Sequence, residues 1–171
     1  MHGRSDHPTY PCDPGHHHGP KFAHNPITRL NAILHRSTHV YFDRILKPYG
    51  LSFTHLRMLA YISHAESARQ EDVRAHLGGD KGGVAHGIRK LTELGYVSRE
   101  PHPDDGRACL LRATDEGWAL LGELAEYGRT WSDRMIEGLS ADEQRQAEEL
   151  LQRMVDNACF LLGEECEASR R

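Results

Sequence analysis

The sequence predicts a mostly α-helical fold that contains one small β-hairpin. Apolar residues recur at helical spacing over most of the chain, capping residues precede these runs, and two strand-like runs, 96–101 and 109–113, flank a polar turn. The 171 residues suffice for one domain with an extension. No apolar run reaches the roughly 18 residues of a membrane span, and the first residues lack the apolar part of a secretory signal. We therefore expect a cytoplasmic protein without a membrane partner.

The chain is expected to begin with a flexible tail that leads into a long helix. Residues 1–24 combine histidine, proline and glycine with few apolar side chains, as disordered segments do. Asn25 and Pro26 are a favoured N-cap and first helical residue, and apolar residues then recur at helical spacing until Pro48. The sequence therefore predicts a helix that begins at Pro26 and ends before Pro48.

The middle of the chain is predicted to form three short helices in front of the hairpin. After a first helix in "YGLSFTHLRMLAYIS", Ser67 and Gln70 have the spacing of a capping box, so we expect Ser67 to open the second helix. Asp80 can cap the third helix, residues 81–94, whose apolar stripe should face inward. Gly95 stands where a glycine commonly ends a helix.

The last part of the chain is predicted to form two long amphipathic helices. Ser140 and Glu143 have capping-box spacing in front of the second of them. The apolar stripes of residues 118–136 and 143–162 are larger than one small domain can cover, and such surfaces usually mark interfaces. The predicted organisation is a tail at 1–24, a helical dimerisation region at 25–50 and 118–171, and a separate domain at 51–117.

The net charge of −4 is unevenly distributed along the chain. Residues 1–50 carry six basic and three acidic groups, residues 51–117 carry nine and ten, and residues 118–171 carry six and twelve. Any polyanion should therefore bind away from the two C-terminal helices.

Three helices followed by a hairpin is the order of a winged helix-turn-helix domain, which binds DNA. The helix at residues 81–94 would then enter the major groove, and Arg107 near the hairpin turn would enter a narrow minor groove. Asp105 could orient the Arg107 guanidinium through paired hydrogen bonds. Taken alone, this composition is equally typical of an ordinary polar hairpin. It is the order of the surrounding helices and strands that favours DNA binding. The predicted DNA contacts are Lys81, Gly82, Gly83, His86, Arg89, Lys90, Asp105 and Arg107.

Particular motifs give the resemblance to a known family. "LTELGYVSRE" followed by Asp105-Gly106-Arg107, and then "RATDEG", resemble the MarR family of bacterial and archaeal transcriptional regulators over residues 27–165. The resemblance implies a homodimeric regulator, either a repressor or an activator, that binds palindromic promoter DNA with an affinity modulated by a small ligand, a metal or oxidation. It also implies that the first helix and the last two helices form the dimer.

The helix at residues 81–94 departs from the family pattern. Many members have Ser-Thr and Thr-Arg where this chain has Gly82-Gly83 and Ala85-His86, and Gly87 follows. Each helical glycine costs about 0.8–1 kcal/mol relative to alanine. The glycines either let the backbone approach DNA closely or leave the helix soft until DNA orders it. Loss of DNA binding is a third, less favoured interpretation because the basic residues remain.

The family resemblance implies an effector site between the dimer helices and the winged domain. A small organic molecule such as a phenolic compound is the favoured effector. The candidate contacts are His39, Phe42, Arg57 and Trp118, although packing residues have the same pattern. We assign no cofactor and no metal site, because the histidines lack further ligands in register. The candidate metal ligands are His16, His17, His18, His35 and His39. Cys109 is a weaker redox candidate, since strand alternation should turn it inward beside Leu111.

The sequence contains no motif typical of an enzyme. It lacks HExxH, GxSxG and a phosphate-binding loop. The predicted function is therefore a homodimeric DNA-binding transcriptional regulator whose affinity depends on a small ligand. One alternative is a metal- or redox-responsive regulator of the same fold, and another is a winged-helix module that binds protein without binding DNA. A steep salt dependence of duplex binding would separate the last alternative from the others.

Overall fold

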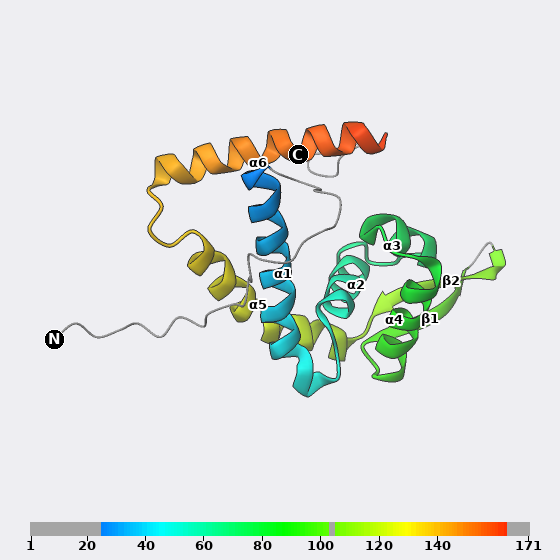
Figure 1. The fold of residues 1–171 in the computed structure, drawn as a ribbon. Helices are drawn as coiled ribbons and strands as arrows, with labels where there is room; N and C mark the ends of the chain where they lie inside the picture. Colours follow the sequence, from blue (N-terminus) through cyan, green and yellow to red (C-terminus); the bar gives the residue numbers. More distant parts are fainter. Residues whose placement is uncertain (1–24, 103–104, 164–171) are drawn as a thin grey trace, which may run out of the picture. The chain divides into compact units, whose positions relative to one another are not determined.

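A computed structural model describes residues 25–102 and 105–163 (Figure 1). The described chain forms six α-helices, one short 3-10 helix and one two-stranded antiparallel sheet. It divides into two compact units, one ending at Phe53 and the other beginning at Thr54. The predicted mostly helical class with a small hairpin is confirmed. No helix among these residues combines the length and the apolar character that a bilayer crossing requires.

The first unit contains α1 (Pro26–Leu46) and η1 (Lys47–Tyr49). The Asn25 side chain accepts a hydrogen bond from the Ile27 amide at 2.9 Å, so the predicted start of this helix is confirmed. Beyond η1, Gly50 reverses the chain with a φ of 66°. The Phe53 amide then donates to Asp43 Oδ1 at 2.7 Å, and the Phe53 ring stacks on Phe42 at 4.8 Å between centroids.

The second unit opens with α2 (Phe53–His64, which begins at the boundary), α3 (Gln70–Leu77) and α4 (Lys81–Glu93). The prediction that Ser67 opens the second of these helices is wrong. Arg69 is the N-cap of α3, and its amide donates to the Asp72 carboxylate at 2.8 Å. The helix begins later because Ala68 is held in an extended bridge to Leu111.

The hairpin consists of β1 (Val97–His102) and β2 (Asp105–Ala113) and extends beyond α4 in Figure 1. Val97 pairs with Ala113 and Pro101 with Cys109, after which the register shifts by a bulge so that His102 pairs with Asp105. The first strand is shifted by one residue from the predicted 96–101, and the second begins at Asp105, four residues before the predicted start at Cys109.

The chain ends in α5 (Asp115–Met135) and α6 (Ala141–Leu162). Thr114 caps α5 by accepting from the Gly117 amide at 3.1 Å. The predicted capping box of α6 is confirmed, since the Ser140 amide donates to Glu143 Oε2 at 2.8 Å and the Ser140 hydroxyl accepts from the Glu143 amide. The hydrogen bonds from Ser140 lower the pKa of the Glu143 carboxyl.

The apolar core of the second unit lies among α2, α3, α4, the hairpin and the first half of α5. It consists of Met58, Leu59, Ile62, Ala68, Val73, Val84, Ile88, Leu91, Val97, Leu111, Leu120 and Leu124. By contrast, α6 buries none of its residues. Near its end Phe160 and Leu161 are 85% and 84% exposed. The core therefore fixes α4 and the hairpin, while α6 keeps its apolar stripe uncovered.

Candidate nucleic-acid interface

The helix α4 has one buried and one exposed face. Its N-cap Asp80 accepts from the Gly83 amide at 2.9 Å, which secures the first turn. The buried face consists of Val84, Gly87, Ile88 and Leu91. The predicted contacts Lys81, Gly82, Gly83, His86 and Arg89 are all exposed, and Lys90 is half-buried. The helix therefore presents cations, an imidazole and bare backbone on one side of the domain.

The three glycines of α4 lie in two different environments. Gly82 and Gly83 are exposed, and a Cβ at either position would approach only the Asp80 side chain. Gly87 is buried, and a Cβ there would lie 2.6 Å from Met58 Sδ and 2.8 Å from Met58 Cε. Gly87 thus lets α4 pack closely on α2, and only the first two glycines loosen exposed backbone.

The hairpin carries the predicted Asp105-x-Arg107 motif within a strand. Both residues belong to β2, so the prediction that they lie in a loop in front of a shorter second strand is wrong. The side chains of residues 105–108 lie outside the described part of the structure. Cys109 is exposed, contrary to the expected inward orientation, whereas Leu111 is buried.

A shallow hollow of about 280 Å³ adjoins the exposed face of α4 and is lined by Gln70, Glu71, Arg74 and Lys81. Within the described ranges, no hydrogen bond or ion pair engages the side chain of Arg74 or Lys81. Sequence reasoning identified Lys81 and missed Arg74. The sequence does place Arg74 in the helix directly before α4, and a basic residue on the exposed side of that helix lies near the predicted DNA contacts.

Comparison with known proteins identifies the family of this chain. A sequence model of the MarR family matches residues 49–108. The HTH-type transcriptional regulator YdgJ of Bacillus subtilis is 30% identical over 108 residues, which span 63% of this chain and 66% of YdgJ. The chain belongs to the MarR family. A second relative is the HTH-type transcriptional regulator BilQ of Clostridioides difficile, which is 28% identical over 66% of this chain and 76% of BilQ.

Solved MarR structures share the winged-helix fold. A MarR protein from Peptoclostridium difficile has a TM-score of 0.75 at 22% identity and covers 84% of this chain and 94% of its own. A mutant MarR from Escherichia coli complexed with operator DNA has a TM-score of 0.68 at 24% identity, covering 76% and 94%. The family and the fold are those of transcriptional regulators.

The four candidate effector contacts lie in two units of this MarR chain. Phe42 is buried against Phe53, and the half-buried His39 ring makes an edge contact with Phe53 at 4.9 Å. Arg57 is half-buried in α2, and Trp118 in α5 is 54% exposed. These positions leave the effector site a prediction.

Only two of the candidate metal ligands lie among the described residues. His35 and His39 place their rings 4.6 Å apart on α1. Among residues 25–102 and 105–163, no group of three or more histidine, cysteine, aspartate or glutamate side chains is positioned to hold a metal. His16, His17 and His18 lie outside the described residues.

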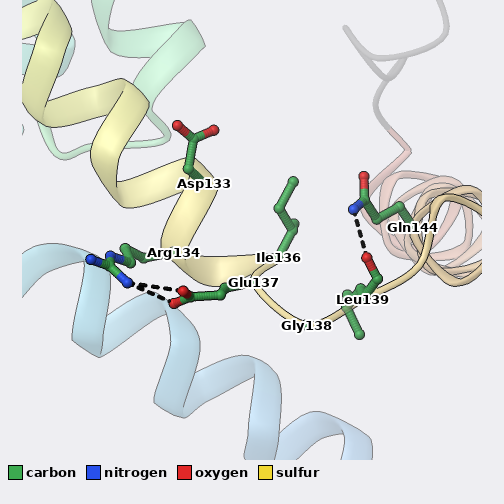
Figure 2. Close-up of a pocket in the computed structure, with 7 residues that line it drawn as sticks. All are labelled: Asp133, Arg134, Ile136, Glu137, Gly138, Leu139 and Gln144. Carbon is green, nitrogen blue, oxygen red and sulfur yellow. Dashed lines mark hydrogen bonds and ion pairs between the residues drawn. The ribbon is translucent and has the colours of Figure 1, made fainter.

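The turn between α5 and α6 borders a hollow of about 540 Å³ (Figure 2). Arg134 donates to both carboxylate oxygens of Glu137 at 2.9–3.0 Å, and Gln144 donates to the Leu139 carbonyl at 2.9 Å. A neighbouring groove of about 480 Å³ is lined by Ile136, Leu139, Gln144, Ala147, Glu148, Leu151, Gln152 and Val155. The first hollow has paired polar groups, and the second exposes apolar side chains of α6.

Proposed function

We propose that this MarR-family protein is a homodimeric transcriptional regulator that binds palindromic promoter DNA. In this proposal α4 enters the major groove, Arg107 of the wing (residues 97–113) enters the adjacent minor groove, and each protomer contacts one half-site. The observation that carries the proposal is the exposed face of α4, where Lys81, His86 and Arg89 stand opposite a fully buried stripe. The operator-bound MarR structure with the same fold supports it.

Binding to a labelled duplex tests the proposal. The duplexes are the region upstream of the protein's own gene and a scrambled sequence of equal length, titrated at several salt concentrations. We expect tighter binding to the upstream duplex and a steep loss of affinity as salt rises, since phosphate contacts release counterions. Absence of duplex binding at low salt, or binding independent of salt, would contradict DNA recognition and favour a protein-interaction module.

The wing contribution is tested by one substitution. Arg107→Ala should weaken binding to the upstream duplex by about 1–3 kcal/mol, and Asp105→Ala should produce part of this loss. Arg153→Ala in α6 is the matched control, because it removes an arginine from the acidic C-terminal region. Equal affinities of the parent and the Arg107 variant would refute a minor-groove role.

The homodimer is supported by the uncovered apolar surface of α6. Leu150, Leu151 and Val155 are exposed in a helix without a buried residue. A second copy of the chain is the occupant we propose, since regulators that bind palindromes are symmetric. Sedimentation should give twice the mass of the chain, and Leu151→Glu should shift it toward the monomer. A monomeric parent at micromolar concentration would refute the dimer.

We further propose that a small organic effector modulates the affinity for DNA. Its candidate contacts are His39, Phe42, Arg57 and Trp118. The large exposed area of Trp118 gives a direct test, because a bound aromatic compound should quench its fluorescence. Trp118→Phe retains Trp131 as the background signal, so quenching that persists in this variant would place the ligand elsewhere.

A further inference from the structure

The wing is joined to the turn between α2 and α3 through its main chain. The Ala68 amide donates to the Leu111 carbonyl at 3.0 Å, and the Leu111 amide donates to the Ala68 carbonyl at 2.8 Å. Both residues are buried, at 3% and 2% exposure. A two-stranded hairpin is at best marginally stable alone, so this bridge gives the wing support from the core.

The Arg112 side chain adds a second connection and links three segments. Its Nε donates to Glu100 Oε2 at 3.0 Å on the neighbouring strand, and its Nη1 donates to the Glu66 carbonyl at 3.2 Å. Among the described residues other than glycine, Glu66 alone has a positive φ, 59°. A left-handed backbone is uncommon for glutamate, and here it occurs in the turn that receives Arg112.

A third connection lies farther along the wing. Arg69 Nη2 lies 2.8 Å from Nε2 of His102, the last residue of β1. A guanidinium has only donors, so His102 Nε2 is the acceptor in this contact. Arg69 is also the N-cap of α3. The outer half of the wing is therefore tied to the start of the helix that precedes α4.

We propose that Arg112, supported by Arg69, is a positioning residue that holds the wing at a fixed angle to α4. This inference rests on the proposed function, because the angle matters only if both elements engage DNA. The turn that Arg112 contacts ends at Arg69 and leads directly into α3, and α3 packs on α4. The wing and α4 are thus both attached to α3 and the turn in front of it, and the two arginines fix the wing to these segments.

The length of the wing makes its angle important. The strand from Arg112 to Asp105 spans about 23 Å at about 3.3 Å per residue. A rotation by about 10° at the inner end would therefore move the outer end by about 4 Å, far beyond the tolerance of a hydrogen bond. A wing that pivots would have to be ordered on each encounter with DNA, which lowers the affinity.

The first experiment compares duplex affinities of three variants. Arg112→Ala should weaken binding about tenfold, near the lower end of the loss expected for a groove contact. Arg112→Lys should lose nearly as much, because one ammonium cannot fork to both acceptors. Arg99→Ala is the control for charge, since Arg99 is exposed on β1 and has no hydrogen bond or ion pair within the described ranges. It should weaken binding about twofold at most. Full affinity in Arg112→Lys, or an equal loss in Arg99→Ala, would overturn the proposal in favour of a charge effect.

The second experiment asks whether Arg112 acts through the wing arginine. In an Arg107→Ala background, Arg112→Ala should have almost no further effect on affinity, because the contact that it positions is already absent. Losses that multiply would show that Arg112 acts independently and would overturn the proposal. The melting temperature of Arg112→Ala should fall by no more than about 4 °C, as expected for an exposed ion pair.

Hydrogen exchange provides a readout that does not depend on DNA. In Arg112→Ala the amides of residues 98–100 and of His102 should exchange faster, whereas those of 84–91 in α4 should not change. If Arg112→Ala does not fold, His102→Ala removes the outer link alone and should show the same pattern. Unchanged exchange in the wing would overturn the proposal. A parent that binds no duplex refutes the proposed function, while faster exchange confined to the wing would still support the fixed wing.

Discussion

Substitution of the glycines in α4 by alanine should change stability in opposite directions at two positions. At Gly82, the added Cβ would lie 3.2 Å from an oxygen of the exposed Asp80 side chain, which can move by a few tenths of an ångström. Gly82→Ala should therefore gain most of the helical preference for alanine, about 0.5–1 kcal/mol. For a chain of this size, this gain in stability raises the melting temperature by about 1–4 °C.

At Gly87 the same substitution should destabilise the protein. The added Cβ would lie 2.6 Å from the sulfur of Met58, a side chain that is itself only 2% exposed. Overpacking of a core costs about 1–3 kcal/mol, and so short a contact with a buried side chain belongs in the upper part of that range, at about 2–3 kcal/mol, of which the helical gain of about 1 kcal/mol offsets only part. We expect a net loss of about 1–2 kcal/mol and a melting temperature lower by about 2–8 °C. Gly83→Ala should be nearly neutral in stability. Its Cβ would displace the capping Asp80 carboxylate, and the loss of this cap cancels the gain in helical preference.

Thermal unfolding followed by circular dichroism measures these differences, and a double-mutant cycle with Met58→Leu identifies their cause. Leucine lacks the extended sulfur and terminal methyl of methionine, so Gly87→Ala should cost less in the Met58→Leu background. Additive effects, or a Gly87→Ala protein more stable than the parent, would refute the close packing of α4 on α2. Gly82→Ala also tests backbone approach to DNA: it should bind duplex more weakly although it is more stable.

Three further predictions concern the helix starts. Gly117→Ala should abolish soluble folded protein or cost about 3 kcal/mol by chemical denaturation, because its Cβ would collide with the main-chain carbonyl of Tyr96, which cannot move away as a side chain can. Asp80→Ala should lower stability by about 1 kcal/mol and speed hydrogen exchange in the first turn of α4, and unchanged exchange there would contradict its role as the cap. The pKa of Glu143 is lowered by its bonds to Ser140, so its contribution to stability is present at neutral pH and disappears as acid protonates it. The parent should therefore melt above Glu143→Gln at about pH 7, and the difference should vanish near about pH 3.

Short sequence motifs predicted where helices begin, because the interactions that start a helix join residues close together in the sequence. Asn25 and Ser140 cap the helices that follow them, since a capping side chain bonds to an amide two or three residues away. The exposed face of α4 also follows from its own apolar spacing. The MarR motif around Asp105 and Arg107 could be recognised because its residues are contiguous in the sequence. The placement of these two residues in a strand could not be predicted. Asp-Gly favours a turn, and only the bulged pairing of His102 with Asp105 extends the strand.

Features that depend on distant parts of the chain could not be read from the sequence. Ser67 has the spacing of a capping box, but Ala68 pairs with Leu111, which follows more than forty positions later, and this delays the start of α3. Gly87 cannot be distinguished from Gly82 and Gly83 by sequence, because only the packing of Met58 against it requires a glycine there. Arg112 likewise had no distinguishing pattern, because its acceptors come from a turn and from the other strand.

The charge near α4 and the apolar surface of α6 together predict a measurable salt dependence. In the proposed complex, each protomer would bring five cations to the duplex, namely Arg74, Lys81, Arg89, Lys90 and Arg107. Each neutralised phosphate contributes about −0.9 to the slope of log affinity against log salt. A monomer should therefore show a slope of about −4 to −5, and a dimer about twice that value. Leu151→Glu, which places a charge on the uncovered face of α6, should halve the slope while leaving the fold unchanged. A slope that is already near −4 in the parent, or that does not change in this variant, would mean that only one winged domain binds the duplex at a time.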